Sequence, residues 1–101
     1  MAKRFDVYEE LKQKGFEETK GSFGQTILFK TYSKEVEVLW YGKQDYSIRV
    51  DVWFNPDHSV VKAFYYDDAR GVRPYKEKTH LNEKRAYNAI CQTVANKGFE
   101  I

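Results

Sequence analysis

The strongest constraint on the fold is a succession of four β-like segments in the middle of the chain. They cover residues 25–32, 35–41, 46–54 and 59–66, and each is rich in β-branched and aromatic side chains. Short segments with turn-forming residues separate them. This pattern predicts consecutive antiparallel hairpins, which together form a meander.

The alternation of side chains predicts which residues share a face of this sheet, because directly paired residues in neighbouring strands point the same way. We place a two-residue turn at Ser33-Lys34 and loops at residues 42–44 and 55–58. These registers predict an apolar inner face made of Ile27, Phe29, Val36, Val38, Trp40, Tyr46, Ile48, Val50, Val52, Phe54, Val61, Ala63 and Tyr65. The predicted outer face carries Lys30, Glu35, Glu37, Arg49, Asp51 and Lys62, and it becomes aromatic at the fourth strand with Trp53, Val60, Phe64 and Tyr66.

A helix is predicted at each end of the sheet. Residues 5–14 form the first, with Gly15 as its C-terminal cap, and residues 82–97 form the second, with Asn82 as its N-cap. The tetrapeptide Lys-Gly-Phe-Glu occurs at 14–17 and again at 97–100, which indicates that the two helices end alike. Gly15 is expected in a Schellman ending, with Phe16 making its hydrophobic contact.

The predicted architecture is therefore α+β, a four-stranded antiparallel meander with the N-terminal and C-terminal helices packed on one face (α-β-β-β-β-α). With 101 residues and no internal linker, the chain is expected to form a single domain over residues 1–101.

Composition restricts the class of partner and the compartment. The formal net charge is only +2, from 17 basic and 15 acidic residues, which is weak for a dedicated nucleic-acid binder. The single cysteine excludes an intramolecular disulfide. We find no apolar signal segment and no run long enough to span a membrane. These features predict a cytoplasmic protein with no membrane contact.

Catalytic signatures are missing from the sequence. It contains no glycine-rich phosphate loop, no nucleophile elbow and no zinc-binding spacing. The two histidines, His58 and His80, lie beside turns, and Cys91 falls on the apolar stripe of the second helix. We therefore expect no catalytic residue, no cofactor and no metal site, and the protein is not expected to be an enzyme.

The most informative surface lies around the end of the fourth strand. Residues 67–79 are expected to form a loop that combines basic side chains with an aromatic ring, directly after the aromatic edge of the sheet. Either this loop folds back over the rings as a small second core, or the rings and cations stay exposed for a partner. The candidate partner-binding residues are Trp53, Phe64, Tyr66, Arg70, Arg73, Tyr75, Lys76 and Lys78.

Two functions fit this surface. The favoured hypothesis is a small non-enzymatic binding protein, an inhibitor, adaptor or accessory factor, that acts through a protein–protein contact. The alternative is a nucleic-acid-binding module in which the rings stack on bases and the cations neutralise phosphates. The first strand, residues 25–32, carries only one charge and is expected at a sheet edge, so pairing of that edge in a homodimer is a further alternative.

Overall fold

The fold is described from a computed structural model, which describes residues 5–67, 74, 76–79 and 82–101. In chain order the elements are α1 (Val7–Gln13), β1 (Glu17–Lys20), β2 (Thr26–Val38), β3 (Gly42–Phe54), β4 (Val60–Tyr66), β5 (Lys76–Thr79) and α2 (Glu83–Asn96).

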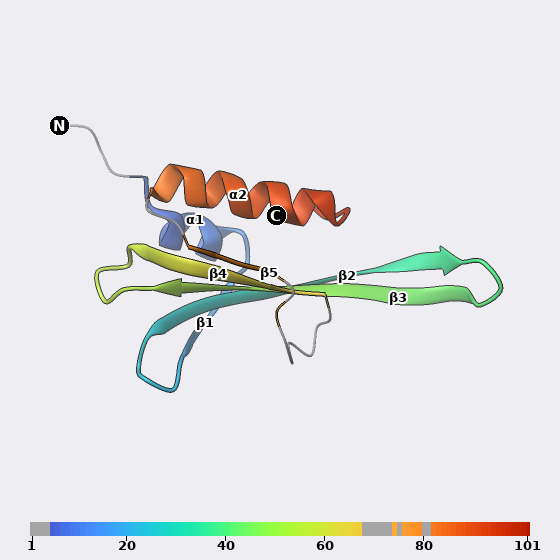
Figure 1. Cartoon of the computed structure of the whole chain (residues 1–101), viewed down its shortest axis with the longest axis horizontal. Helices are drawn as coiled ribbons and strands as arrows, with labels where there is room; N and C mark the ends of the chain where they lie inside the picture. Colours follow the sequence, from blue (N-terminus) through green and yellow to red (C-terminus); the bar gives the residue numbers. More distant parts are fainter. Residues whose placement is uncertain (1–4, 68–73, 75, 80–81) are drawn as a thin grey trace.

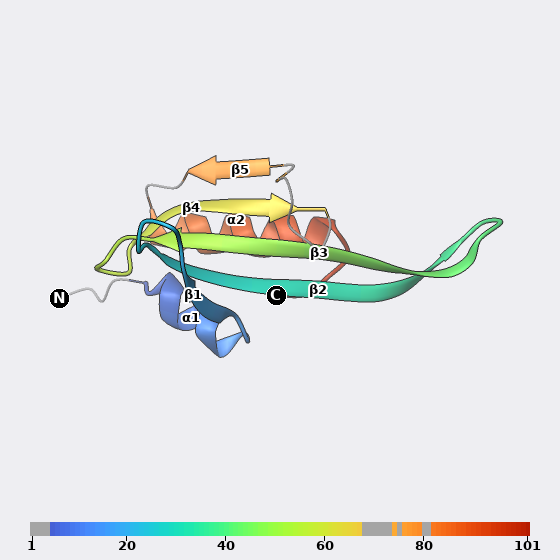
Figure 2. The same cartoon turned by 90° about the horizontal axis from the view of Figure 1, so that it is seen from below.

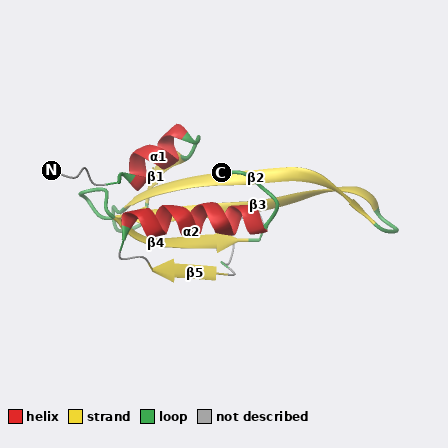
Figure 3. Cartoon of the chain, turned by 90° about the horizontal axis from the view of Figure 1, so that it is seen from above, coloured by secondary structure: helices red, strands yellow, loops and turns green. Residues whose placement is uncertain are grey.

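The five strands form one antiparallel sheet in the order β1-β2-β3-β4-β5. Both helices lie on the same face of this sheet, and α2 runs along it above β3 and β4 (Figures 1 and 3). The predicted α+β architecture, with a helix at each end of the chain packed on one face of an antiparallel meander, is confirmed. The number of strands is five, not four, because short strands are added at both edges.

The predicted first hairpin is wrong. Residues 25–32 and 35–41 were expected as two strands around a Ser33-Lys34 turn, whereas Thr26–Val38 is one continuous strand. It pairs with β3 along its whole length, from Thr26↔Phe54 to Val38↔Gly42, so the turn lies at Leu39-Trp40-Tyr41 and not at residues 42–44. This pairing places Leu28, and not the predicted Ile27 and Phe29, opposite the core residue Val52 on the helix-covered face.

Two lysines of β2 point toward the helices although they are charged, because each bonds to the end of one helix. The Lys30 ammonium donates to the carbonyl oxygen of Lys14, at 2.7 Å, where α1 ends. The Lys34 ammonium donates to the carbonyl oxygen of Gly98, at 3.2 Å, where α2 ends. Helix ends leave carbonyl groups without intrahelical partners and carry a partial negative charge, so a cation is favourable there. One strand thus caps both helices.

The predicted similarity of the two helix ends is confirmed. After α1, Phe16 N–H donates to the Leu11 carbonyl at 3.0 Å, and Gly15 has a φ of 95°. After α2, Phe99 N–H donates to the Val94 carbonyl at 3.2 Å, and Gly98 has a φ of 86°. Both are Schellman endings, which need a left-handed residue that glycine adopts without a steric penalty.

The third hairpin was predicted with the correct strands and an incorrect register. We expected Val52 opposite Val61, but Val52 pairs with Ala63 and a bulge follows between Trp53 and Phe54. Because of the bulge, Val60 is buried in the core and Val61 lies in the wall of a surface pocket. The Val60 N–H donates to the carboxylate of Glu83, in the first turn of α2, which ties this strand to the helix.

The core lies between the helices and the covered face of the sheet. It is formed by Val7, Leu11, Phe16, Leu28, Tyr32, Ile48, Val50, Val52, Phe54, Val60, Ala63, Tyr65, Ala86, Ile90 and Val94. The Asn82 N-cap is confirmed, since its side-chain oxygen accepts a hydrogen bond from Arg85 N–H at 3.1 Å. No helix among the described residues is long and apolar enough to cross a membrane.

Candidate binding face of the sheet

The face of the sheet opposite the helices is the candidate functional site, and we call it the open face. The strand register brings Phe29, Asp51 and Phe64 into one row across β2, β3 and β4. On either side of that row, Thr31, Arg49 and Tyr66 form a second row, and Ile27, Trp53 and Lys62 form a third. No described helix packs against these residues, because both helices lie on the other side (Figure 1).

Arg49 contacts two rings and a carboxylate on the open face. Its guanidinium carbon lies 4.9 Å from the centre of the Phe29 ring and 5.9 Å from that of Tyr66. Its nitrogens Nε and Nη2 donate to the two carboxylate oxygens of Asp51, at 2.7 and 3.2 Å. Asp51 itself is buried. A bidentate ion pair and two ring contacts therefore fix the guanidinium in one position.

The aromatic rings continue the face toward the β3–β4 loop. The Trp53 and Phe64 rings lie 4.9 Å apart in a tilted arrangement, which is within the range of favourable ring pairs. Lys62 lies beside them, with its ammonium 5.6 Å from the Phe64 ring and 2.9 Å from the Glu77 carboxylate of β5. Four half-buried rings and an arginine thus share one surface, namely Phe29, Trp53, Phe64, Tyr66 and Arg49.

The charges of this face cancel locally. Arg49 is neutralised by Asp51, and Lys62 by Glu77. Burial raises the pKa of the Tyr66 phenol, with a further contribution from the Asp51 carboxylate that the Arg49 guanidinium opposes. The phenol is therefore protonated at neutral pH and is available as a hydrogen-bond donor.

The structure divides the residues that the sequence grouped together. Trp53, Phe64 and Tyr66 lie on the open face, as expected. Lys76 and Lys78 were placed in a loop beside them, but they belong to β5 and pair with Tyr65 and Ala63, whose side chains point to the helices. They line a 210 Å³ pocket against Gln92, Thr93 and Asn96 of α2.

Arg70, Arg73 and Tyr75 lie outside the described residues, as does His80. The alternatives for the 67–79 segment are thus resolved only for its last part, since residues 76–79 pair with the β4 edge. At the other edge, β1 pairs with residues 26–29 of β2, so β1 occupies the edge at which we considered a homodimer.

Sequence reasoning missed Phe29 as a member of the site and assigned Arg49 only to a solvated charge ladder. Alternation could have placed Phe29 in the site, because Ile27, Phe29 and Thr31 are spaced by two residues and so share one face. In the structure these three residues pair with Trp53, Asp51 and Arg49, respectively. The incorrect turn at Ser33-Lys34 reversed the face assigned to this strand, because a shift of one residue exchanges the two faces.

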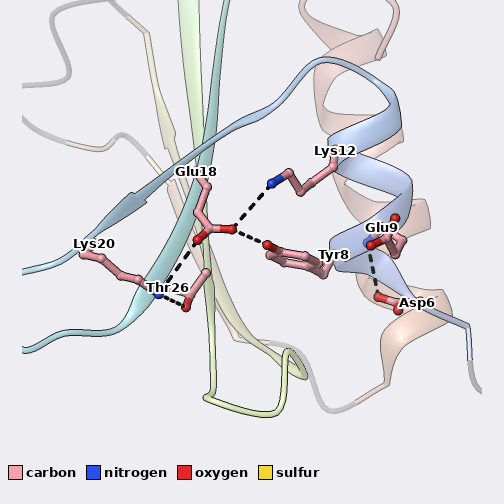
Figure 4. Close-up of polar contacts among 7 residues, drawn as sticks. All are labelled: Asp6, Tyr8, Glu9, Lys12, Glu18, Lys20 and Thr26. Carbon is pink, nitrogen blue, oxygen red and sulfur yellow. Dashed lines mark hydrogen bonds and ion pairs between the residues drawn. The ribbon is translucent and has the colours of Figure 1, made fainter.

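A second polar cluster joins α1 to β1 (Figure 4). The Tyr8 hydroxyl donates to the Glu18 carboxylate, which also pairs with Lys12 at 3.6 Å and Lys20 at 3.9 Å. The Tyr8 ring stacks on His58, with 3.8 Å between the centroids. The hydrogen bond to Glu18 raises the pKa of Tyr8, so this phenol is a structural donor and a poor nucleophile.

In the described part of the chain, no group of three or more His, Cys, Asp or Glu side chains is arranged to hold a metal ion. Comparison of the chain with protein-family models, with curated proteins and with solved structures finds no match. The proposal for function therefore depends on the geometry of the fold.

Proposed function

We propose that this chain is a small non-enzymatic binding protein that recognises a protein partner through the open face of its sheet. The observation that supports this proposal is the position of the Arg49 guanidinium against the Phe29 and Tyr66 rings, on a face that the helices leave uncovered. Tryptophan, tyrosine and arginine are the residues that contribute most to protein–protein binding energy.

The balance of charge favours a protein over a nucleic acid. Binding to a phosphate backbone gains its free energy from cations that neutralise phosphates and release counterions. On the open face Arg49 and Lys62 already have carboxylate partners, so binding of phosphates would compete with two existing ion pairs. A protein surface with its own rings and hydrogen-bond acceptors needs no such exchange.

Preorganisation supports the same conclusion. Immobilising a flexible side chain on binding costs about 0.5–1.5 kcal/mol. Arg49 is held by Asp51 at 2.7 Å and lies between two rings before any partner arrives, so most of this cost falls on folding. Arg49 therefore has little conformational entropy left to lose when a partner binds.

The test is affinity capture in the native host, followed by calorimetry with the captured protein in purified form. We expect Phe64→Ala and Tyr66→Ala each to weaken binding at least about tenfold, the loss typical of a hot-spot residue. Arg85→Ala is the control, because it removes a large side chain from the exposed surface of α2, which lies on the other side of the sheet. Tyr66→Phe keeps the ring and removes only the hydroxyl group, so it should retain more binding than Tyr66→Ala and separates a loss of contact from a loss of fold.

The result would contradict the proposal if both open-face variants, folded by circular dichroism, bound the partner with wild-type affinity. The nucleic-acid alternative is examined by fluorescence polarisation with single-stranded RNA, single-stranded DNA and duplex DNA at low salt. Binding that falls steeply as salt increases, and that Tyr66→Ala removes, would replace the protein partner with a nucleic acid.

A further inference from the structure

The β2–β3 hairpin continues far beyond the rest of the sheet. β1 pairs with β2 only over residues 26–29, and β4 pairs with β3 only over residues 49–54. Residues 30–38 and 42–48 therefore pair only with each other. The inner part of this ribbon packs under the helices through Tyr32 and Ile48. Residues 35–38 and 42–45 extend beyond the helices as a two-stranded arm, whose tip lies at one end of the molecule's 56 Å long axis (Figures 1 and 2). An isolated two-stranded ribbon is only marginally stable in water, which suggests that another surface covers the arm.

The tip of this arm is uncharged and exposes large side chains. Leu39 is 78% exposed, Trp40 91% and Tyr41 74%. Within the described chain, only Phe23 is a large hydrophobic residue with a comparable exposure. Three consecutive exposed residues of this kind are unusual on a protein that stays alone in water, and they are typical of a contact surface.

Backbone strain at Trp40 is a second, independent observation. Its φ is 78°, the left-handed region that bulky side chains rarely adopt, and Tyr41 N–H closes the turn by donating to the Val38 carbonyl at 3.1 Å. Glycine would suit this position of the turn better. A side chain kept at a strained position commonly serves binding, because folding alone would favour its replacement.

The opposite end of the molecule carries an apolar pocket of about 400 Å³. Its lining contains no charged side chain and comprises Phe23, Gly24, Gln25, Trp53, Phe54, Asn55, Pro56 and Val61. These residues come from the β1–β2 and β3–β4 loops and the strand ends beside them, which lie far from the arm (Figure 1). The volume falls within the range of small-molecule sites, which is enough to admit an indole ring.

We propose that chains associate head to tail, with Trp40 of one copy inserted in the pocket of the next. The β1–β2 and β3–β4 loops, which supply most of the pocket lining, lie at the other end of the chain from the tip (Figure 1), so the tip cannot reach the pocket of its own chain. Both surfaces are apolar and uncharged. Burial of Trp40 together with Phe23 removes from water the two most exposed rings among the described residues. Such a contact is heterologous, so it produces a ring or an open chain of copies.

The charges behind the tip favour the pocket of a second copy over an anionic surface as the binding partner of the tip. Residues 35–45, the arm with its tip, carry Glu35, Glu37 and Asp45 against the single lysine Lys43, which pairs with Glu35 at 3.5 Å. This excess of carboxylates would repel a phosphate backbone or an acidic membrane surface. The uncharged pocket of a second copy meets no such repulsion.

The test measures association in mixtures of complementary variants. Wild-type protein should form species that grow with concentration in sedimentation velocity, whereas Trp40→Ser and Val61→Glu should each remain monomeric, near the 12.0 kDa of the single chain. An equal mixture of the two variants should form a dimer of twice this mass and nothing larger. Only a head-to-tail contact predicts this outcome, because one variant supplies an intact tip and the other an intact pocket.

A second pocket variant protects the test against misfolding. Phe23 is 96% exposed, so Phe23→Ser should leave the fold unchanged and still weaken association. Trp40→Gly should also abolish association while relieving backbone strain, and we expect the protection of the Tyr41 amide from hydrogen exchange to rise several-fold. Tyr66→Ala, which changes only the open face, should assemble like the wild type.

Three results would overturn the proposal. The first is a wild-type protein that stays monomeric up to its solubility limit. The second is association that Trp40→Ser abolishes but that the mixture with Val61→Glu does not restore, which indicates contact between two tips. The third is a monomer whose tryptophan fluorescence shifts to the blue with phosphatidylcholine vesicles in the wild type but not in Trp40→Ser, which identifies a lipid surface as the occupant.

Discussion

At the scale of single residues, the left-handed glycine after α2 both ends the helix and leaves room for a lysine of β2. Gly98 has a φ of 86°, and a methyl group built on it would collide with the ammonium of Lys34, which donates to the Gly98 carbonyl. The glycine therefore serves both the turn of the backbone and the approach of the lysine. These two contributions can be separated by substitution.

Gly98→Ala should reduce the free energy of unfolding by about 1–2 kcal/mol through left-handed strain, and by less than about 1 kcal/mol more because the exposed, flexible Lys34 side chain must move away and gives up its hydrogen bond. Urea denaturation measures this difference. Gly24→Ala is the matched control, because Gly24 has a φ of 80° but no atom within 4 Å of the added methyl group. It should cost only the backbone strain, about 1–2 kcal/mol. Equal losses in the two variants would disprove the contribution of Lys34.

The cluster around Glu18 predicts a dependence on pH. The Tyr8 hydrogen bond holds the pKa of the Glu18 carboxyl below its ordinary value of 4.5, with help from Lys12 and Lys20. A depressed pKa stabilises the fold above that ordinary value, and this contribution is lost as the pH falls through the lower folded pKa. Acidification should therefore loosen the contact between α1 and β1.

Tyr8→Phe should raise the Glu18 pKa toward 4.5, because the largest cause of its depression is removed. The pKa is measured by following the Glu18 side-chain carboxyl carbon in NMR titrations of both proteins. Glu17, the neighbouring exposed carboxylate of β1, provides the internal control. An unchanged Glu18 pKa would show that the hydroxyl contact is unimportant in solution.

At the scale of elements, α2 depends on its N-cap and on its packing. The Asn82 side chain accepts from Arg85 N–H at 3.1 Å, and Glu83 then bonds to the start of β4. The N-cap satisfies an N–H group that has no partner inside the helix.

Asn82→Ala should lower the unfolding free energy by about 1 kcal/mol, the usual cost of losing such a cap. Asn96→Ala, at the exposed end of the same helix, should change it by less than about 0.5 kcal/mol. Thermal and urea denaturation of the two variants test the difference. A loss in Asn96→Ala as large as that in Asn82→Ala would argue against the cap.

At the scale of the whole molecule, apolar side chains perform two distinct tasks. Leu28 is fully buried under the helices, whereas Leu39 is exposed at the tip of the arm. A domain of this size is stabilised by about 5–15 kcal/mol in total, so a single core residue carries a large part of that margin.

Leu28→Ala should destabilise the fold by about 2–5 kcal/mol, through lost burial and the cavity that remains. Leu39→Ala removes the same atoms and should change stability by less than about 0.5 kcal/mol. If Leu39→Ala proved equally destabilising in a monomeric sample, the arm would have to pack against the body, which would contradict the extended hairpin.

Local signals in the sequence were sufficient for some elements. The two helices, the Asn82 cap and the glycine endings at 15 and 98 depend on interactions within a few residues, so they could be recognised without the fold. The strand segments 46–54 and 59–66 were also recognisable, because valine, isoleucine and aromatic side chains dominate both. The open-face positions of Trp53, Phe64 and Tyr66 followed from their alternation.

Only the tertiary structure decided the face of β2 and the existence of β1 and β5. Segment 26–34 has large side chains on both faces, so alternation alone is ambiguous there; the carbonyl groups at the two helix ends select the face with Lys30 and Lys34. The Glu-Glu-Thr-Lys and Lys-Glu-Lys-Thr segments are exposed and polar, with little strand propensity. They become strands because the edges of β2 and β4 offer backbone groups that need partners.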